Sequence, residues 1–275
     1  MNHIVIKNFE KLKIIFLYIP IIILAIITCG LYYNNLLSKD QYINFQKDFF
    51  IFINHTLADY PITLYNITQL GDALIILSFL TIFLIYAPKL WEALIIASIL
   101  SAIIVAILKP LFAIKRPAAV FSHDDFFIIG QKLMGHNSFP SGHSVTVFTV
   151  LTIVLIAFFP KGIKQQFAWC ISIIIFGVLI VLTRIGVGAH HPFDIIVGGI
   201  LGYLMGVSGI VLSNKYNLWA SIVNKKIYPI FILLFVICSI ILVFKILDTN
   251  LIIFYFALVS LLISIYVTTF LYVKK

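Results

Sequence analysis

Long apolar segments without internal charges are the feature that most constrains this chain. A bilayer core about 30 Å thick needs about 20 mostly apolar residues for each helical span. Windows of this kind occur at 13–35, 67–87, 91–112, 142–159, 166–186, 192–212, 227–246 and 250–271. Only 11% of the residues are charged, whereas a soluble domain has about a quarter. We therefore expect an all-α, polytopic membrane helix bundle with about eight transmembrane helices, formed by residues 1–275 as a single membrane domain.

Basic residues are unevenly distributed between the two sides of the expected bundle. If the N-terminus is cytoplasmic, the inside loops and tails hold eleven lysines against only Glu10 and Glu92. These lysines are Lys7, Lys11, Lys13, Lys89, Lys161, Lys164, Lys215, Lys225, Lys226, Lys274 and Lys275. The other eight basic and eight acidic residues balance on the outer side. This positive-inside pattern predicts that both termini are cytoplasmic, and it accounts for the net charge of +9 without nucleic acid as a partner.

Ionisable side chains gather at the outer ends of several expected spans. These residues are Lys109, Arg116, His143, Arg184, His190, His191 and Asp194. Such groups are costly in a membrane, so each of them is a functional hypothesis. A divalent cation is disfavoured there, because only one carboxylate offsets three cations. Guanidinium groups bind phosphate through paired hydrogen bonds, so we predict a phosphate site without a metal ion.

The stretch FPSGHSVTVF, residues 139–148, opens the fourth expected span with polar residues and glycine. Gly142 allows close approach of a ligand to the backbone. If a helix begins near Ser141, its free amides and positive dipole end favour an anion. The alternative is an ordinary loop that ends in a helix cap, because serine is a favoured capping residue.

Two histidines supply groups for covalent chemistry. His190 and Asp194 are four residues apart at the start of the sixth expected span, and Pro192 suits the first helical turn. A carboxylate bonded to one imidazole nitrogen fixes the tautomer and makes the other nitrogen the better nucleophile. His143 is then available to protonate a leaving oxygen. The alternative is a pair of histidines that are hydrogen-bonded at a helix interface.

Together these residues resemble a three-part signature. It consists of Lys109 and, after six intervening residues, Arg116-Pro117; then Pro140-Ser141-Gly142-His143; and then Arg184, five intervening residues, His190, three intervening residues and Asp194. The sequence is similar in this respect to the type 2 phosphatidic acid phosphatase superfamily, and within it to the bacterial membrane lipid phosphatases. The resemblance covers residues 66–212. One position departs from the pattern, because Thr183 stands where the family usually has serine.

The resemblance implies a six-helix catalytic core and a role for each motif residue. It makes His190 the nucleophile that forms a phosphohistidine, Asp194 its orienting group, and His143 the acid and later the base. The residues that hold the phosphoryl oxygens would be Lys109, Arg116, Ser141, Gly142 and Arg184. No metal or other cofactor is required in the phosphatase branch. The expected location is the bacterial inner membrane with a periplasmic site, while residues 227–275 form a C-terminal helix pair of unknown role.

The substrate is expected to be a membrane lipid with a terminal phosphate or diphosphate. Undecaprenyl diphosphate, phosphatidylglycerol phosphate and the 1- or 4'-phosphate of lipid A all satisfy this description. The candidates for substrate selectivity lie in the loop 118–137 and are His123, Asp124, Asp125, Lys132 and His136. Two alternatives remain open: a lipid phosphotransferase that uses the same histidine, and a transporter, although carrier sites tend to lie at the bilayer midplane. The sequence does not determine the oligomeric state.

Overall fold

The computed structural model describes residues 1–216 and 224–274, and every regular element within these ranges is a helix. This confirms the all-α class. Six helices in the described part of the chain are long and apolar enough to cross a membrane. They are α2 (Tyr18–Tyr33, extended by η1, Ile14–Leu17), α8 (Pro88–Phe112), α10 (Ile163–Gly186), α11 (Pro192–Tyr216), α12 (Tyr228–Thr249) and α13 (Ile252–Val273). A shorter apolar helix, α9 (Gly142–Ala157), lies among them.

The expected span 67–87 is not one continuous helix, so the count of eight spans is not confirmed. The segment is divided into α5 (Pro61–Thr68), η2 (Gln69–Gly71), α6 (Ala73–Ser78) and α7 (Phe83–Tyr86). The side chain of Asp72 caps α6 by accepting a hydrogen bond from the Leu74 amide at 2.9 Å.

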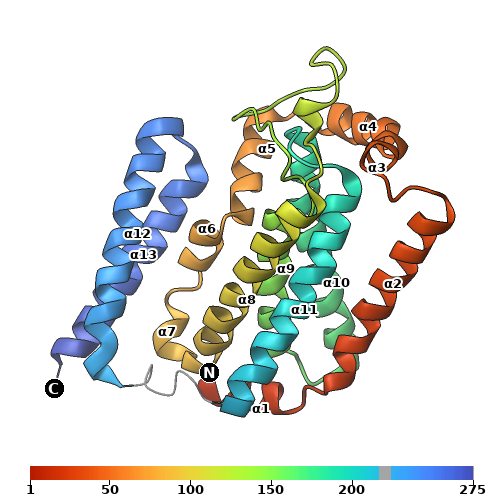
Figure 1. Ribbon diagram of the computed structural model, residues 1–275. Helices are drawn as coiled ribbons and strands as arrows, with labels where there is room; N and C mark the ends of the chain where they lie inside the picture. The colour runs from red at the N-terminus through yellow and green to blue at the C-terminus, as the bar shows by residue number, and fades with distance from the viewer. Residues whose placement is uncertain (217–223, 275) are drawn as a thin grey trace.

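Neighbouring helices satisfy the backbone groups that this break frees. Ser260 Oγ of α13 donates to the Ser78 carbonyl at 2.9 Å, and Trp91 Nε1 of α8 donates to the Leu80 carbonyl at 2.8 Å. An unpaired carbonyl is costly in lipid, so these two bonds explain how irregular backbone is tolerated here. The C-terminal pair α12–α13 therefore packs against the broken segment (Figure 1). Its division from the catalytic core as a separate unit remains a prediction.

Close contact between α9 and α11 sets the geometry of the site. A Cβ atom at Gly202 would overlap the Val145 carbonyl oxygen, and one at Gly198 would lie 2.8 Å from the Ser141 carbonyl oxygen. Small residues at such a crossing let two helix backbones approach closely. As a result the N-termini of the two helices meet, and the Ser141 amide donates to the Asp194 carbonyl at 3.0 Å.

The ends of the bundle differ in their covering segments (Figure 1). At one end lie α3 (Lys39–Phe45), α4 (Lys47–Ala58) and the 113–141 loop with η3 (Pro117–Ala119). The opposite end has α1 (Asn2–Glu10), η5 (Lys225–Ile227) and both chain termini. The segments rich in lysine lie together at this second end, as the positive-inside argument requires; Lys275 lies outside the described residues. Which end faces the cytoplasm remains a prediction.

Candidate active site

The helix ends at the α3–α4 end of the bundle carry the motif residues. Lys109 lies in the last turn of α8 and Arg184 in the last turn of α10. Ser141 and His143 lie at the start of α9, His190 lies in the loop after α10, and Asp194 lies in the first turn of α11. The buried members of the group are Arg116, Ser141, Arg184, His190 and Asp194. Three motifs that are distant in sequence therefore meet in one place.

The two ring nitrogens of His190 have different partners. Nε2 lies 3.4 Å from Arg116 Nη1, whereas Nδ1 lies 3.4 Å from Asp194 Oδ2. A guanidinium group only donates, so we assign Nε2 as the acceptor and place the ring proton on Nδ1. Burial lowers the pKa of His190 below its ordinary value, which keeps the imidazole neutral. Nε2 therefore carries a lone pair on the side where the site cations gather.

The Asp194 carboxylate is held by more donors than His190 alone. Oδ2 accepts from Ser138 Oγ at 2.6 Å and from the His191 amide at 2.9 Å, and Oδ1 accepts from the Tyr42 hydroxyl at 2.9 Å. Burial, together with the Asp194 charge, raises the pKa of Tyr42 well above its ordinary value, so Tyr42 remains a donor. These bonds fix the carboxylate beside His190 Nδ1.

Two buried guanidinium groups provide positive charge. Arg116 donates through Nε to Asn137 Oδ1 at 2.7 Å and through Nη1 to the Ala189 carbonyl at 3.0 Å. Arg184 donates through Nη1 to Thr68 Oγ1 at 2.8 Å, while its buried Nε has no hydrogen-bond partner among the described residues. Buried donors are almost always paired. The Arg184 Nε–H group therefore favours an oxyanion ligand.

Ser141 acts as the cap of α9, as the alternative interpretation held. Its Oγ accepts from the Ser144 amide at 3.3 Å and from Ser144 Oγ at 3.0 Å, and its own amide donates to the Asp194 carbonyl. The Ser141 amide is therefore engaged and does not offer the free donor that the sequence suggested. The Ser141 hydroxyl hydrogen and the Gly142 amide remain as the donors for an anion at this helix start.

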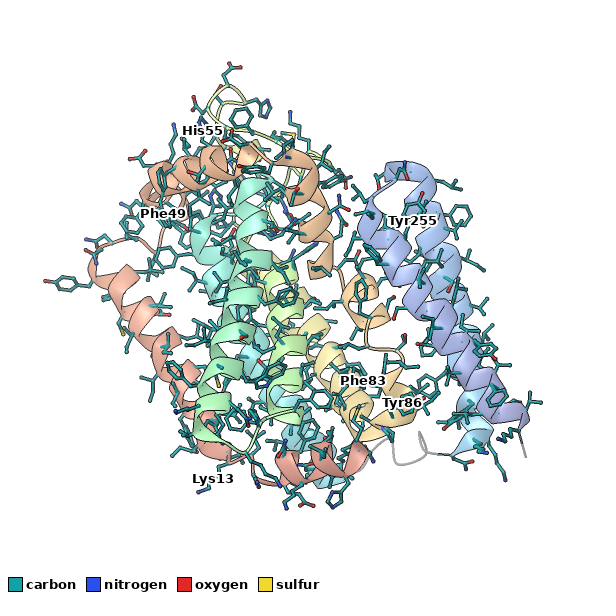
Figure 2. The ribbon with its side chains drawn as sticks, turned by 180° about the vertical axis from the view of Figure 1, so that it is seen from behind. Lys13, Phe49, His55, Phe83, Tyr86 and Tyr255 are labelled. Carbon is teal, nitrogen blue, oxygen red and sulfur yellow. The ribbon has the colours of Figure 1, made fainter. Side chains whose placement is uncertain are left out.

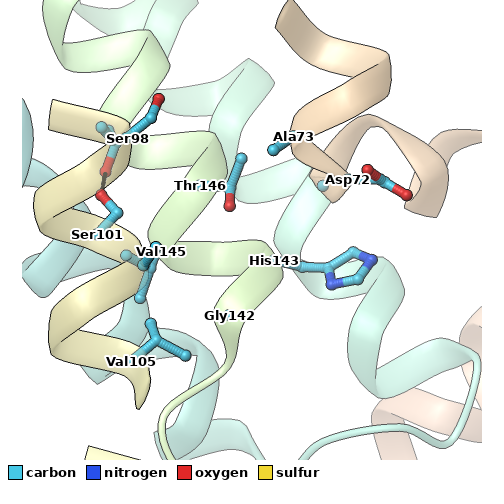
Figure 3. Close-up of a pocket in the computed structure, with 12 residues that line it drawn as sticks. Asp72, Ala73, Ser98, Ser101, Val105, Gly142, His143, Val145 and Thr146 are labelled. Atoms are coloured by element: carbon cyan, nitrogen blue, oxygen red, sulfur yellow. Dashed lines mark hydrogen bonds between the residues drawn. The ribbon is translucent and has the colours of Figure 1, made fainter. Parts of the chain in front are cut away.

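His143 packs against the break in the segment 67–87. A Cβ atom at Gly71 would lie only 2.5 Å from His143 Cδ2. His143 and Gly142 also line a cavity of about 300 Å³ between α6, α8 and α9, whose walls include Ser101 and Val105 (Figure 3). The His143 imidazole and this cavity are thus adjacent.

Lys109 joins the other cations electrostatically. It is partly buried and interacts through its charge with Arg116, Arg184 and Asp194. It makes no hydrogen bond or ion pair within residues 1–216 and 224–274 that would hold its amine elsewhere. The amine is therefore available to a phosphoryl oxygen.

The five candidates for selectivity lie in the 113–141 loop. Asp125 pairs with Lys47 of α4 at 3.4 Å, and Lys132 Nζ lies 3.4 Å from His123 Nδ1. Asp124 and His136 are exposed. The described contacts do not link any of these side chains to His190, Arg116 or Arg184. Their role in selectivity remains a prediction.

Four residues of the site were not found from the sequence: Tyr42, Thr68, Asn137 and Ser138. Asn137 and Ser138 immediately precede the FPSGH motif, so their position was the one available signal. His191, which the sequence singled out, contributes its backbone amide, while its ring lies beside Phe121 and the Lys115 carbonyl.

The described residues include no group of three or more His, Cys, Asp or Glu side chains that could hold a metal ion. The donor set around His190 is cationic, with Arg116, Arg184 and Lys109 facing the single carboxylate of Asp194. These residues fit an oxyanion better than a divalent cation.

Comparisons with known proteins agree with this geometry. Residues 89–218 match the PAP2 superfamily. The fold is similar to that in the crystal structure of LpxE from Aquifex aeolicus, with a TM-score of 0.51 and 24% sequence identity. That similarity covers 61% of this chain and 95% of the other. A comparison with curated proteins gave no match.

Proposed function

Residues 89–218 belong to the PAP2 superfamily, the type 2 phosphatidic acid phosphatases, and on that premise we propose that this protein is a membrane lipid phosphatase with His190 as its nucleophile. The observation that carries the proposal is the orientation of His190. Its Nδ1 is held beside Asp194, and its Nε2 faces Arg116. A neutral imidazole with this tautomer is poised to attack a phosphorus atom whose oxygens are held by cations.

The proposed reaction has two displacements at phosphorus. In the first, His190 Nε2 bonds to phosphorus while the bond to the lipid oxygen breaks, and protonated His143 gives its proton to that oxygen. In the second, neutral His143 takes a proton from water, the water oxygen bonds to phosphorus, and the bond to Nε2 breaks. Asp194 stabilises the positive charge on His190 between the two steps.

The cations act mainly through position. Phosphoryl transfer leaves little covalent work for the protein beyond the nucleophile, so catalysis depends on orientation and charge stabilisation. Arg116 and Arg184 are buried and fixed by Asn137 and Thr68. Lys109 and the start of α9 complete a set of donors for the three non-bridging oxygens. We propose that no metal or other cofactor takes part.

The neighbouring cavity supports a lipid as substrate. Gly142 and His143 line it at the start of α9, Val105 of α8 lies beside Gly142, and Ser101 of α8 lines it further along (Figure 3). A lipid tail in this cavity would leave its phosphate near His143 and His190. We propose undecaprenyl diphosphate, phosphatidylglycerol phosphate and the lipid A phosphates as substrates to test, with the site on the periplasmic face of the inner membrane.

Phosphate release from a panel of lipids tests the proposal. The purified protein is offered each candidate lipid, with His190→Ala as the inactive variant and exposed His55→Ala as the matched control. We expect release by the wild type and His55→Ala and none by His190→Ala, with activity unchanged by a chelator. Equal release by His190→Ala contradicts the nucleophile assignment, and loss of activity with the chelator contradicts the metal-free mechanism. Release that requires an acceptor lipid identifies a phosphotransferase.

A further inference from the structure

A second cavity, of about 950 Å³, lies at the end of the bundle opposite the active site. It is formed by α1, η1, the end of α9 and the start of α10, with Tyr203 of α11. Figure 2 shows Lys13, in the connection between α1 and η1, at the end of the molecule away from His55 of α4. The first candidate span begins at Ile14. This cavity therefore lies at the level of a membrane surface.

One rim of the cavity is basic. His3, Lys7 and Lys11 follow one another at intervals of four residues and so lie on one face of α1 and its extension. Lys161 in the loop between α9 and α10 lines the same cavity. Within the described residues, none of these three lysines forms an ion pair, and Glu10 does not line the cavity. Among the described residues, therefore, no carboxylate is paired with these three lysines.

The remainder of the cavity is largely apolar. Ile4, Leu12 and Phe16 line it on one side, and Leu155 and Phe159 line it on the other. Three of these side chains are substantially exposed: Ile4 at 55%, Phe16 at 41% and Phe159 at 37%. Exposed apolar surface beside a row of cations matches an amphipathic ligand with an anionic head group.

The rim is a fixed feature of the fold, because α1 is firmly attached to the bundle. Val5 and Phe9 are fully buried. Asn8 Nδ2 donates to the carbonyls of Ala157 at 3.0 Å and Phe159 at 3.2 Å, and Asn214 Nδ2 donates to the Phe9 carbonyl at 3.0 Å. These contacts hold the lysine-bearing face of α1 opposite Lys161.

We propose that this cavity binds an anionic phospholipid from the membrane leaflet opposite the active site. Lys7, Lys11 and Lys161 surround its head group, where they attract a net negative charge and repel the quaternary ammonium group of a zwitterionic lipid. Its acyl chains lie against Phe16, Phe159 and their apolar neighbours. A lysine near an anionic membrane surface contributes about fivefold to lipid binding. Three such lysines are enough to select an anionic lipid over a zwitterionic one by at least about tenfold.

Competition between two lipids tests this proposal. The full-length protein is placed in nanodiscs that contain phosphatidylglycerol and phosphatidylcholine with identical chains, and the lipids retained after release into detergent are measured by native mass spectrometry. Phosphatidylglycerol carries a phosphodiester, so it does not offer the terminal phosphate required at His190. The His190→Ala variant should therefore bind it as the wild type does, which keeps this test independent of the proposed function.

The variants separate the effect of the lysines that line the cavity from the effect of the total positive charge at this end of the bundle. We expect the wild type to retain phosphatidylglycerol over phosphatidylcholine by at least about tenfold. The substitution of Lys7, Lys11 and Lys161 by alanine should remove the preference, and their substitution by arginine should keep it. The matched control replaces three other lysines of the same end: Lys13, Lys164 and Lys226. It should behave as the wild type.

Crosslinking locates the lipid without relying on any variant that folds poorly. A photoactivatable phosphatidylglycerol should label the wild type within residues 3–16 and 155–170. No lipid preference in the wild type would overturn the proposal. So would equal loss in the matched control, or labelling confined to other segments.

Discussion

The Tyr42 hydroxyl is expected to be needed for catalysis although it does not reach the substrate. It donates to Asp194 Oδ1 at 2.9 Å inside the protein. The Tyr42→Phe variant keeps the aromatic contacts with Phe139 and Phe193 and removes only this donor. A hydrogen bond to a charged group contributes about 1.5–3 kcal/mol. If that energy positions Asp194 in the transition state, kcat falls by about 10- to 150-fold.

The split between kcat and KM distinguishes positioning from a general loss of structure. Tyr42 bonds Asp194 and not the phosphate-binding cations, so KM should change by less than about threefold. Phosphate release from the best lipid of the panel gives both constants, and thermal unfolding shows whether the variant remains folded. Tyr33→Phe is the matched control, because Tyr33 is 86% exposed. A folded Tyr42→Phe variant with wild-type kcat would refute the positioning role.

Three further perturbations follow from the site geometry. Gly71→Ala places a methyl group 2.5 Å from His143 Cδ2; the imidazole must move, and kcat should fall by at least about tenfold. Thr68→Val removes the partner of Arg184 Nη1 and should lower kcat/KM by about tenfold or more. Burial lowers the pKa of His190, so the unfolded state binds an extra proton below about pH 6.5. The free energy of unfolding should therefore decrease as the pH falls below that value.

Each of these expectations has its own control. Gly30→Ala should leave kcat unchanged, because a Cβ atom there meets nothing within 4 Å. Thr68→Ser should restore kcat/KM, since it keeps the hydroxyl. The pH dependence of unfolding, measured by thermal denaturation, should be weaker in His190→Gln. A Gly71→Ala variant with full activity would contradict the role of the close packing between Gly71 and His143. A His190→Gln variant with the wild-type pH dependence would show that burial of His190 does not cause that dependence.

Local spacing explains why the residues that we propose as catalytic could be grouped from the sequence. His190 and Asp194 are four residues apart at the start of α11, so their contact follows from the local chain. The sequence predicted the first and last residues of α8, α9, α10 and α11 to within a few positions, because each of these helices coincides with a long apolar window. Topology then determined that the polar groups share one end of the bundle.

Long-range partners could not be predicted in the same way. Tyr42 is 152 residues from Asp194, and Thr68 is 116 residues from Arg184. No periodicity indicates such pairs, since they depend on how α3 and α5 pack on the bundle. The prediction that the segment 67–87 is one continuous helix was wrong because this segment, too, depends on contacts with distant parts of the chain. Its hydropathy is that of a span, but the bonds from Trp91 and Ser260 that permit its break come from other helices.

Detection of the covalent intermediate tests the central claim most directly. A lipid-like phosphate ester with a good leaving group needs no proton from His143, so His143→Ala should form the phosphoenzyme and then fail to activate water. After a rapid quench at alkaline pH, peptide mass spectrometry should find the phosphoryl group on His190, at higher occupancy in His143→Ala than in the wild type. A phosphoryl group on another residue, or turnover without any phosphorylated His190, would contradict the account.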